Sequence, residues 1–447
     1  MRRRRAGLGF ERRPPRWRIA LAALGVAAVL GLLMLEAASL GWIYLQRGVL
    51  YYGIAEKSVE DMPAALQVPD AVFHPYMGFI HRVGRKGEGW TTNNVGFQVA
   101  SALPAGAPDC CDYPHPRRMG ELLVGIFGGS VATDFALGAQ VSDTLVRRLR
   151  EIPAWRDREP RVLNFAMPAF RQPQQLATLA WLRALGQEFD VIVNIDGFNE
   201  IVTSQKNWQS GVEPIFPADT LWGAWGRELE QAAGRGAPTS ADRALATYYT
   251  AMAARRRAEA GRCLLASCHV AKRLIARLAH WRGERLAASS RRNSDGQRAT
   301  LFPTAIQSRF GENFDVLDYA AARWRDSSQA MAALARDAGA IYLHVIQPNQ
   351  WWRESGDYRP IAADHIYGWV IEPVNKGYPA LVERVPSLRA AGVEVLDATL
   401  LFKGQPDRAV YADDCCHYTA EGNERLMSAI ADAIAAMHAE GRAVAGH

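Results

Sequence analysis

The sequence predicts an α/β fold: a three-layer α/β/α sandwich built on a five-stranded parallel sheet. Short apolar runs, which are typical of buried parallel strands, alternate with segments of helical periodicity. The chain also ends in a segment with apolar residues on one helical face. The expected strands are residues 122–127, 161–168, 190–195, 340–347 and 393–396, and the expected helices are residues 131–152, 174–185, 319–338, 379–391 and 421–440.

The alternation stops after the third expected strand, which predicts a helical insertion. Ala and Arg recur at helical spacing in residues 241–287, and residues 288–300 have the composition of a loop. Farther on, Pro386 must kink or divide the expected helix 379–391, whose first turn suits Pro379. The expected organisation is an Arg-rich cytoplasmic tail (1–18), a transmembrane anchor (19–45), a stalk and strand-and-turn lead-in (46–120), the first part of the α/β domain (121–205), the helical insertion (206–318) and the second part of the domain (319–440).

The positive charge of the chain is concentrated at its N-terminus. Residues 1–18 hold eight arginines and Glu11, a charge of +7, so the rest of the chain carries 6 − 7 = −1 of the formal total of +6. The basic character therefore does not predict a nucleic-acid partner. Residues 19–45 are apolar enough to span a membrane, and the arginines before them predict that the N-terminus stays in the cytoplasm.

Everything after this anchor is expected outside the cytoplasm, as in a periplasmic domain. The alternative is a signal peptide cleaved near Ala37-Ala38-Ser39. The apolar run is long for a signal peptide and continues past that point, which favours an uncleaved single-pass anchor.

Six cysteines suit an oxidising compartment, and they fall into three sequence-local pairs. We expect disulfides among them, without a fixed connectivity. One option joins the first pair to the last and so ties two loops together; a zinc site is the weaker alternative. The pairs are Cys110 with Cys111, Cys263 with Cys268, and Cys415 with Cys416.

A serine follows two glycines at the end of the first expected strand. Gly128 and Gly129 permit a tight turn, and Ser130 stands where a helix would begin. Open α/β sheets bind ligands at this edge, the carboxyl ends of the strands. Ser130 is therefore a candidate nucleophile, and a helix N-cap is the plain alternative.

A serine nucleophile needs a base, an orienting carboxylate and donors for the oxyanion. His417 and Asp414 lie three residues apart in the loop before the last expected helix, and we predict that they are the base and the carboxylate. Asp413 competes with Asp414 for the second role. The Ser130 backbone N–H and the Asn199 side chain are the candidate oxyanion donors.

Four segments in this order resemble the SGNH (GDSL-like) hydrolase superfamily, and in particular its membrane-anchored extracytoplasmic members. The resemblance implies that Ser130 is the nucleophile, that His417 is the base and Asp414 its partner, and that Asn199 and Ala169 contribute to the oxyanion hole. Ala169 stands where the family has a glycine, and Gly129 where it usually has an acidic residue. The segments are GGSVA at Ser130, NFAMPAF at 164–170, DGFNE at 196–200 and DCCHYTAEGN at 414–423, with NNVGFQ at 93–98 resembling the lead-in of anchored members.

The resemblance implies an esterase that uses a Ser-His-Asp acyl-enzyme mechanism and no cofactor or metal. We expect it to act on O-acyl groups of a cell-envelope or exported glycan, or on another small ester. One alternative is an O-acyltransferase that passes the acyl group to a polysaccharide. Another is a non-catalytic polysaccharide-binding or scaffold protein with a partner in an export complex.

Two further features have a structural and a functional interpretation each. Trp351 and Trp352 suit either stacking on a sugar ring or internal packing. His344 lies within an expected strand, where a hydrogen-bonded core histidine is the favoured interpretation.

Overall fold

The computed structural model describes residues 16–47, 51–53, 71–102, 111–209, 212–218, 263–272, 313–355, 368–405 and 407–439, with positions 274, 275, 278, 281 and 310. Its residues form two compact units, 1–60 with 238–297 and 61–237 with 298–447, and each is described by itself. Four parts of the sequence lie wholly or mostly outside the described residues: positions 1–15 of the predicted cytoplasmic tail (1–18), Cys110, most of the stalk, and most of the helical insertion with the loop 288–300.

The larger unit is built on the predicted five-stranded sheet, and every strand pair in it is parallel. In space the order is β10-β9-β8-β6-β7. The first strand of the chain therefore lies between the second and the third, which makes the β6–β8 boundary the point where the connections change direction. The strands are β6 (Glu121–Gly128), β7 (Glu159–Asn164), β8 (Val191–Asp196), β9 (Ile341–Ile346) and β10 (Glu394–Asp397).

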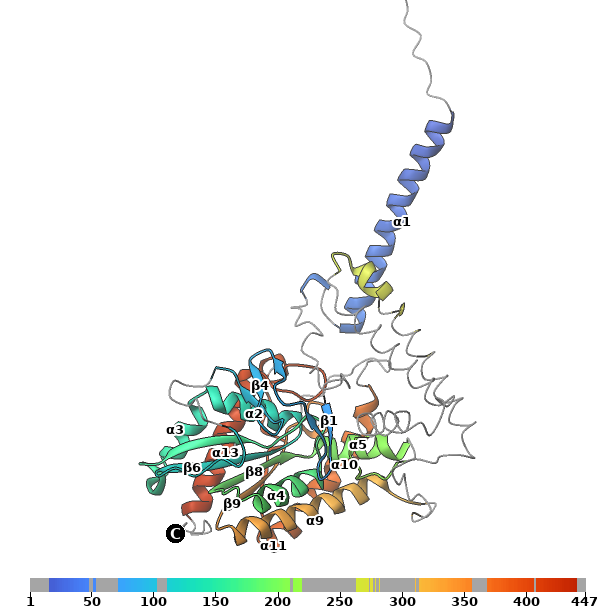
Figure 1. Cartoon of the computed structure of the whole chain (residues 1–447). Coiled ribbons are helices and arrows are strands. Elements are labelled where there is room, and N and C mark those ends of the chain that lie inside the picture. Colours follow the sequence, from blue (N-terminus) through green and yellow to red (C-terminus); the bar gives the residue numbers. More distant parts are fainter. Residues whose placement is uncertain are drawn as a thin grey trace, which may run out of the picture. The chain divides into compact units, whose positions relative to one another are not determined.

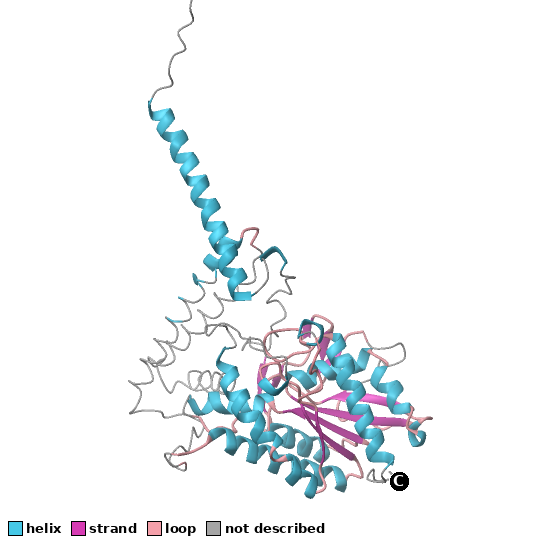
Figure 2. Cartoon of the chain, turned by 180° about the vertical axis from the view of Figure 1, so that it is seen from behind, coloured by secondary structure: helices cyan, strands magenta, loops and turns pink. Residues whose placement is uncertain are grey.

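Helices cover both faces of the sheet, which completes the predicted three-layer sandwich (Figures 1 and 2). One layer holds α2, α3 and α13, and the other holds α4, α5, α9, α10 and α11. The central strands β6, β8 and β9 are buried at every position, as their continuous apolar sequences require. The helices are α2 (Ser130–Val141), α3 (Thr144–Arg150), α4 (Gln174–Ala184), α5 (Phe198–Gln209), α9 (Val316–Asp337), α10 (Gly368–Val382), α11 (Val385–Ala390), α12 (Asp407–Val410) and α13 (Ala420–Ala439), with short 3-10 turns at Pro153–Trp155 and Arg353–Ser355.

Two predicted helices differ from those observed. The segment 131–152 forms α2 and α3 because Ser142 takes an extended conformation and its hydroxyl accepts a hydrogen bond from the Thr144 N–H. Pro386 does divide the next one, and it stands in the first turn of α11. The prediction for Pro379 was wrong, since α10 begins far upstream at Gly368 and contains this proline in its interior.

The lead-in segment forms two small antiparallel sheets. Strands β1 (Ala71–His74) and β2 (Gly78–His81) form one, and β3 (Lys86–Gly87), β4 (Trp90–Thr92) and β5 (Gln98–Ala100) form the other. Buried amide side chains attach them to the sandwich. Asn164 Nδ2 donates to Gln98 O at 2.9 Å, and Gln174 Nε2 donates to Met77 O at 2.7 Å.

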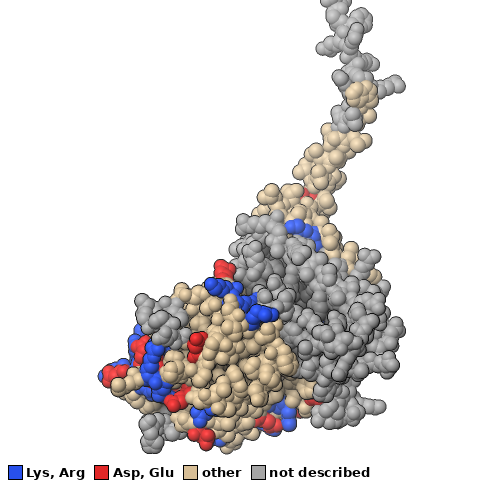
Figure 3. Space-filling view, viewed as in Figure 1, with Lys and Arg blue, Asp and Glu red and all other residues tan. Residues whose placement is uncertain are grey.

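Exposed charges of both signs lie on this unit. Lys376, for example, pairs with Glu372 at 2.7 Å. On the face in Figure 3, the described Lys and Arg side chains lie among Asp and Glu side chains rather than in one positive patch.

The smaller unit contains α1 (Arg16–Arg47), a long helix with exposed apolar side chains, and the 3-10 turn Tyr51–Gly53. Residues Ala23–Leu45 of α1 are long and apolar enough to cross a membrane, with a mean hydropathy of 2.1, although a signal sequence passes the same test. The one acidic residue of this helix, Glu36, accepts hydrogen bonds from Ala266 N at 2.6 Å and Ser267 N at 2.9 Å. It thereby satisfies backbone donors where the helical residues 266–272 begin.

Candidate active site

The strand order gathers the candidate site at one edge of the sheet. Ser130 follows β6 directly, and Asn199 lies in the first turn of α5, just after β8. Because β6 and β8 are parallel neighbours, with Gly128 opposite Ile195, these two residues lie at the same edge. This edge is also the point where the connections change direction, which is where open α/β sheets form their binding crevices.

A serine, a histidine and an aspartate form a hydrogen-bonded array at this edge. Ser130 Oγ lies 2.8 Å from His417 Nε2, although the two residues are 287 positions apart in the sequence. His417 Nδ1 lies 2.5 Å from Asp413 Oδ2. The plain alternative for Ser130, a helix cap, does not describe the structure, because Gly129 occupies the N-cap position of α2.

The carboxylate beside His417 is that of Asp413, which corrects the prediction of Asp414. One oxygen of Asp413 pairs with the imidazole. The other, Oδ1, accepts hydrogen bonds from three successive backbone N–H groups, those of Cys415 at 2.9 Å, Cys416 at 3.0 Å and His417 at 3.1 Å. The loop therefore folds around the Asp413 side chain. This brings Asp413 close to the ring of His417, four residues farther along the chain. Spacing alone could not distinguish the two neighbouring aspartates.

The loop after β9 holds this aspartate–histidine loop in place. Gln350 Nε2 donates to Asp413 O at 3.0 Å, and Trp351 Nε1 donates to Asp414 O at 3.1 Å. The Tyr418 hydroxyl donates to Pro348 O at 2.7 Å. Trp351 and Trp352 are both buried, so these rings pack internally and offer no open face for a sugar.

The environment of His417 favours its protonated form. Burial opposes the charge, but the hydrogen bond and negative charge of Asp413, with smaller contributions from Asp134 and Cys415, raise the pKa of His417 to about 10. Burial likewise opposes the charge of Asp413, yet the hydrogen bond from His417 holds the pKa of this carboxyl below its ordinary value. Such a pair stabilises the imidazolium that forms when a histidine takes a proton from serine.

Close approach of Asn199 to the serine turn explains the glycine at position 129. A Cβ atom added to Gly129 would lie 2.3 Å from Asn199 Nδ2. This amide group also donates to Phe170 O at 3.0 Å, so it bridges the turns after β6 and β7. Gly128 has φ +142°, and a Cβ atom there would lie 2.0 Å from Ile195 O. Both glycines are therefore dictated by contacts at the strand ends.

Ala169 adopts the left-handed conformation that the glycine position requires, with φ +67°. This conformation is strained for an alanine. Its position beside Phe170, the residue that accepts the Asn199 hydrogen bond, puts its backbone near the other candidate oxyanion donors.

Sequence reasoning missed Glu200, which links the two turns that carry Ala169 and Asn199. Glu200 Oε1 accepts from Gln172 N at 3.0 Å, and Oε2 accepts from Gly197 N at 2.7 Å. Burial, together with the charge of Asp196, raises the pKa of Glu200 to about 8. The acidic residue of the DGFNE segment could have indicated a role for Glu200. Only the fold shows which two turns its carboxyl group joins.

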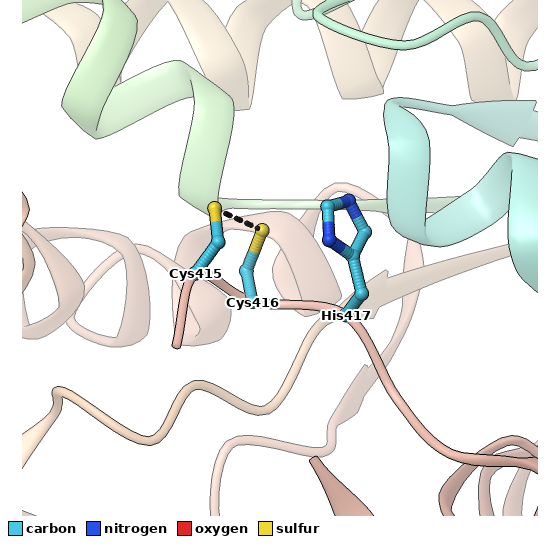
Figure 4. A group of neighbouring side chains, drawn as sticks. All are labelled: Cys415, Cys416 and His417. Atoms are coloured by element: carbon cyan, nitrogen blue, oxygen red, sulfur yellow. Dashed lines mark hydrogen bonds between the residues drawn. The ribbon is translucent and has the colours of Figure 1, made fainter. Parts of the chain in front are cut away.

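The cysteine predictions have mixed outcomes. Cys263 and Cys268 form a disulfide, as one of the three predicted pairs. Cys111 is also disulfide-bonded. Cys415 and Cys416 are free thiols, so the prediction that they form disulfides was wrong, including the option that links them to the Cys110–Cys111 pair. The two thiols lie beside His417 (Figure 4).

A second Ser-His-Asp array lies inside the fold. Ser328 Oγ is 2.6 Å from His344 Nδ1, and His344 Nε2 is 2.8 Å from Asp196 Oδ1. Ser328 and His344 are fully buried, so this array has no access to a substrate. The predicted core role of His344 is confirmed.

The fold and the described geometry define a class: an α/β sandwich with a serine–histidine–aspartate array at the carboxyl edge of its sheet. No protein-family model matches the chain, and comparison with curated proteins gives no match. Among solved structures, the chain is similar to a lipase/acylhydrolase from Enterococcus faecalis, with 11% identity over 71% of this chain and 96% of that chain. The TM-score is 0.30, and the fold is defined by the sheet order of the chain itself.

Proposed function

We propose that this protein is a serine ester hydrolase of the SGNH type that works through an acyl-enzyme on Ser130. The observation that supports this most is the continuous hydrogen-bonded array from Ser130 Oγ through His417 to Asp413. His417 accepts the Ser130 proton while Oγ attacks the ester carbonyl, and Asp413 stabilises the resulting imidazolium. The Ser130 and Ala169 N–H groups and the Asn199 amide are the proposed oxyanion donors. His417 then returns the proton to the leaving alcohol, and water releases the acyl group.

We propose an O-acylated glycan of the cell envelope, or an exported one, as the substrate. The support is the apolar helix α1, which is suited to hold the domain at a membrane surface with its N-terminus in the cytoplasm. Trp351 and Trp352 are buried and do not support sugar binding. The proposed substrate class is supported instead by the apolar helix α1 and by the sequence motifs that resemble the SGNH superfamily.

Hydrolysis of p-nitrophenyl acetate by the purified chain tests the proposed chemistry. Ser130→Ala is expected to lower the rate by at least about 10³-fold, because no other group replaces the nucleophile. The matched control is Ser328→Ala, which removes the serine of the buried array and should leave the rate within about two-fold of the original, at a stability cost of about 1–3 kcal/mol. Equal rates for Ser130→Ala and the unmodified chain would refute the proposal. Nitrophenol release that requires an added oligosaccharide would identify a transferase instead.

A further inference from the structure

Cys415 and Cys416 are adjacent thiols next to the proposed catalytic base. Their sulfur atoms are only 3.0 Å apart. Figure 4 shows both side chains on the same side of the loop as the His417 ring, and one ligand atom of each lies within 4.8 Å of the others. Cys415 is half-buried and Cys416 is buried, so Cys415 is the more accessible of the two residues.

These thiols differ from the other described cysteines. Cys111 is disulfide-bonded, and Cys263 is bonded to Cys268. A chain that forms such bonds elsewhere meets conditions in which thiols oxidise. The reduced pair beside His417 is therefore exposed to the same chemistry.

The backbone between the two thiols is part of the candidate site. The Cys416 N–H, which belongs to the peptide group joining the two cysteines, donates to Asp413 Oδ1 at 3.0 Å. The N–H groups of Cys415 and His417 bond to the same oxygen. Disulfide sulfurs lie about 2.05 Å apart, so a bridge must pull these sulfur atoms together by roughly 1 Å and close a small ring that contains this peptide group. A bridge that reorients this peptide group would weaken the hydrogen bonds that hold Asp413 against His417.

We propose that Cys415 and Cys416 form a modification site that takes small-molecule or protein disulfides as oxidants, and that the resulting Cys415–Cys416 bridge displaces Asp413 and His417 and suppresses activity. The second half of this inference rests on the proposed hydrolase function. The first half, formation of the bridge, does not.

The chemistry is thiol–disulfide exchange. The Cys415 thiolate attacks one sulfur of the oxidant, forms a mixed disulfide and releases the first thiol. The Cys416 thiolate then attacks Cys415 Sγ, which closes the bridge and releases the second thiol. The two protein sulfurs lose two electrons in total, the oxidant gains them, and the two protons leave on the released thiols. Burial raises the pKa of Cys416 well above its ordinary value, so Cys415 is the one expected to react first.

The test compares the full-length chain in detergent after treatment with reduced or with oxidised glutathione. Mass spectrometry of the peptide that contains both cysteines should show the loss of two hydrogen atoms after oxidation, with no glutathione attached. Ester hydrolysis should fall by about 100-fold, because a displacement of roughly 1 Å at a catalytic group has that effect, and dithiothreitol should restore it. Cys415→Ser and Cys416→Ala, whatever their own rates, should each show the same rate after the two treatments, which also controls for changes at the other cysteines.

Several results would overturn the inference. Thiols that remain free, or that stop at a glutathione adduct, would exclude the bridge. A bridge that changes neither the rate nor the NMR resonances of the His417 ring would exclude its coupling to the site. A zinc ion held by the reduced pair, with no oxidation in its presence, would assign the cluster to metal binding instead. If no form of the chain hydrolyses esters, the proposed function fails, and the His417 resonances still report whether the bridge moves the ring.

Discussion

Two neighbouring aspartates have different environments in the loop before α13. One carboxylate oxygen of Asp413 pairs with His417, and the other accepts hydrogen bonds from three backbone N–H groups. Asp414 contributes its backbone carbonyl, which accepts the Trp351 hydrogen bond. The pair therefore offers matched variants, one that removes the carboxylate at His417 and one that removes a neighbouring charge.

Asp413→Asn is expected to lower kcat by about 10³- to 10⁴-fold, because an amide neither orients the imidazole correctly nor stabilises its charge. Asp414→Asn should stay within a few-fold of the unmodified chain. Steady-state hydrolysis of p-nitrophenyl acetate measures both, and the reverse ranking would restore Asp414 as the partner of His417.

The same pair predicts the direction of the pH dependence. His417 must be neutral to accept the serine proton, and Asp413 raises the pKa of His417 to about 10 despite burial. The value of kcat/KM should therefore keep rising with pH above the ordinary histidine pKa of about 6.5. In Asp413→Asn the residual activity should have its midpoint shifted to lower pH. A midpoint below about 6.5 in the unmodified chain would contradict this assignment.

The close approach of the Asn199 side chain requires a glycine at position 129. Gly129→Ala adds a Cβ atom where the Asn199 amide now lies, and the flexible asparagine must move aside. We expect kcat to fall by about 10²-fold, since loss of one oxyanion donor costs about 10²- to 10³-fold. Stability should change little. Gly138→Ala, within α2, meets only the end of Met427 and is the matched control, with unchanged kcat. Equal kcat values for the two variants would remove Asn199 from the proposed oxyanion hole.

At the scale of elements, the site depends on how the loop after β9 holds the loop before α13. The contacts come from Gln350 and Trp351 to the backbone of Asp413 and Asp414, and from Tyr418 back to Pro348. None of these residues touches Ser130 in the described contacts. Their role is to position the aspartate–histidine loop.

Trp351→Phe keeps a ring in the core but removes the hydrogen bond to Asp414 O. We expect kcat to fall by about three- to ten-fold with KM unchanged, in line with the loss of about 1 kcal/mol from one hydrogen bond. The matched control is Trp352→Phe, because the Trp352 ring packs near Tyr378, with 5.8 Å between ring centres. A loss of stability in both variants with no difference in kcat would show that Trp351 serves packing alone.

At the scale of the whole molecule, sequence patterns predicted the sheet because its strands are buried on both faces and read as continuous apolar runs. They predicted Ser130 and Asn199 because each follows a strand, and His417 because it lies in the loop before the last helix. They could not distinguish Asp413 from Asp414 as the partner of His417. They also could not predict that Cys415 and Cys416 are free thiols or that Glu200 links two turns. Those depend on side-chain directions and loop geometry, which local spacing does not determine.

The two compact units carry different parts of the proposed function. The unit with α1 carries the apolar segment Ala23–Leu45, and the larger unit contains the whole candidate site. The proposed chemistry therefore requires only residues of the larger unit, and α1 bears on where the protein acts.

Covalent labelling with a fluorophosphonate reports directly whether Ser130 is a nucleophile, because this reagent reacts with a serine only when a base activates it. We expect one label per chain, mapped by mass spectrometry to the peptide that contains Ser130. Labelling should disappear in Ser130→Ala and persist in Ser328→Ala. A label that survives Ser130→Ala, or a properly folded chain that takes no label, would contradict the assignment of Ser130 as the nucleophile.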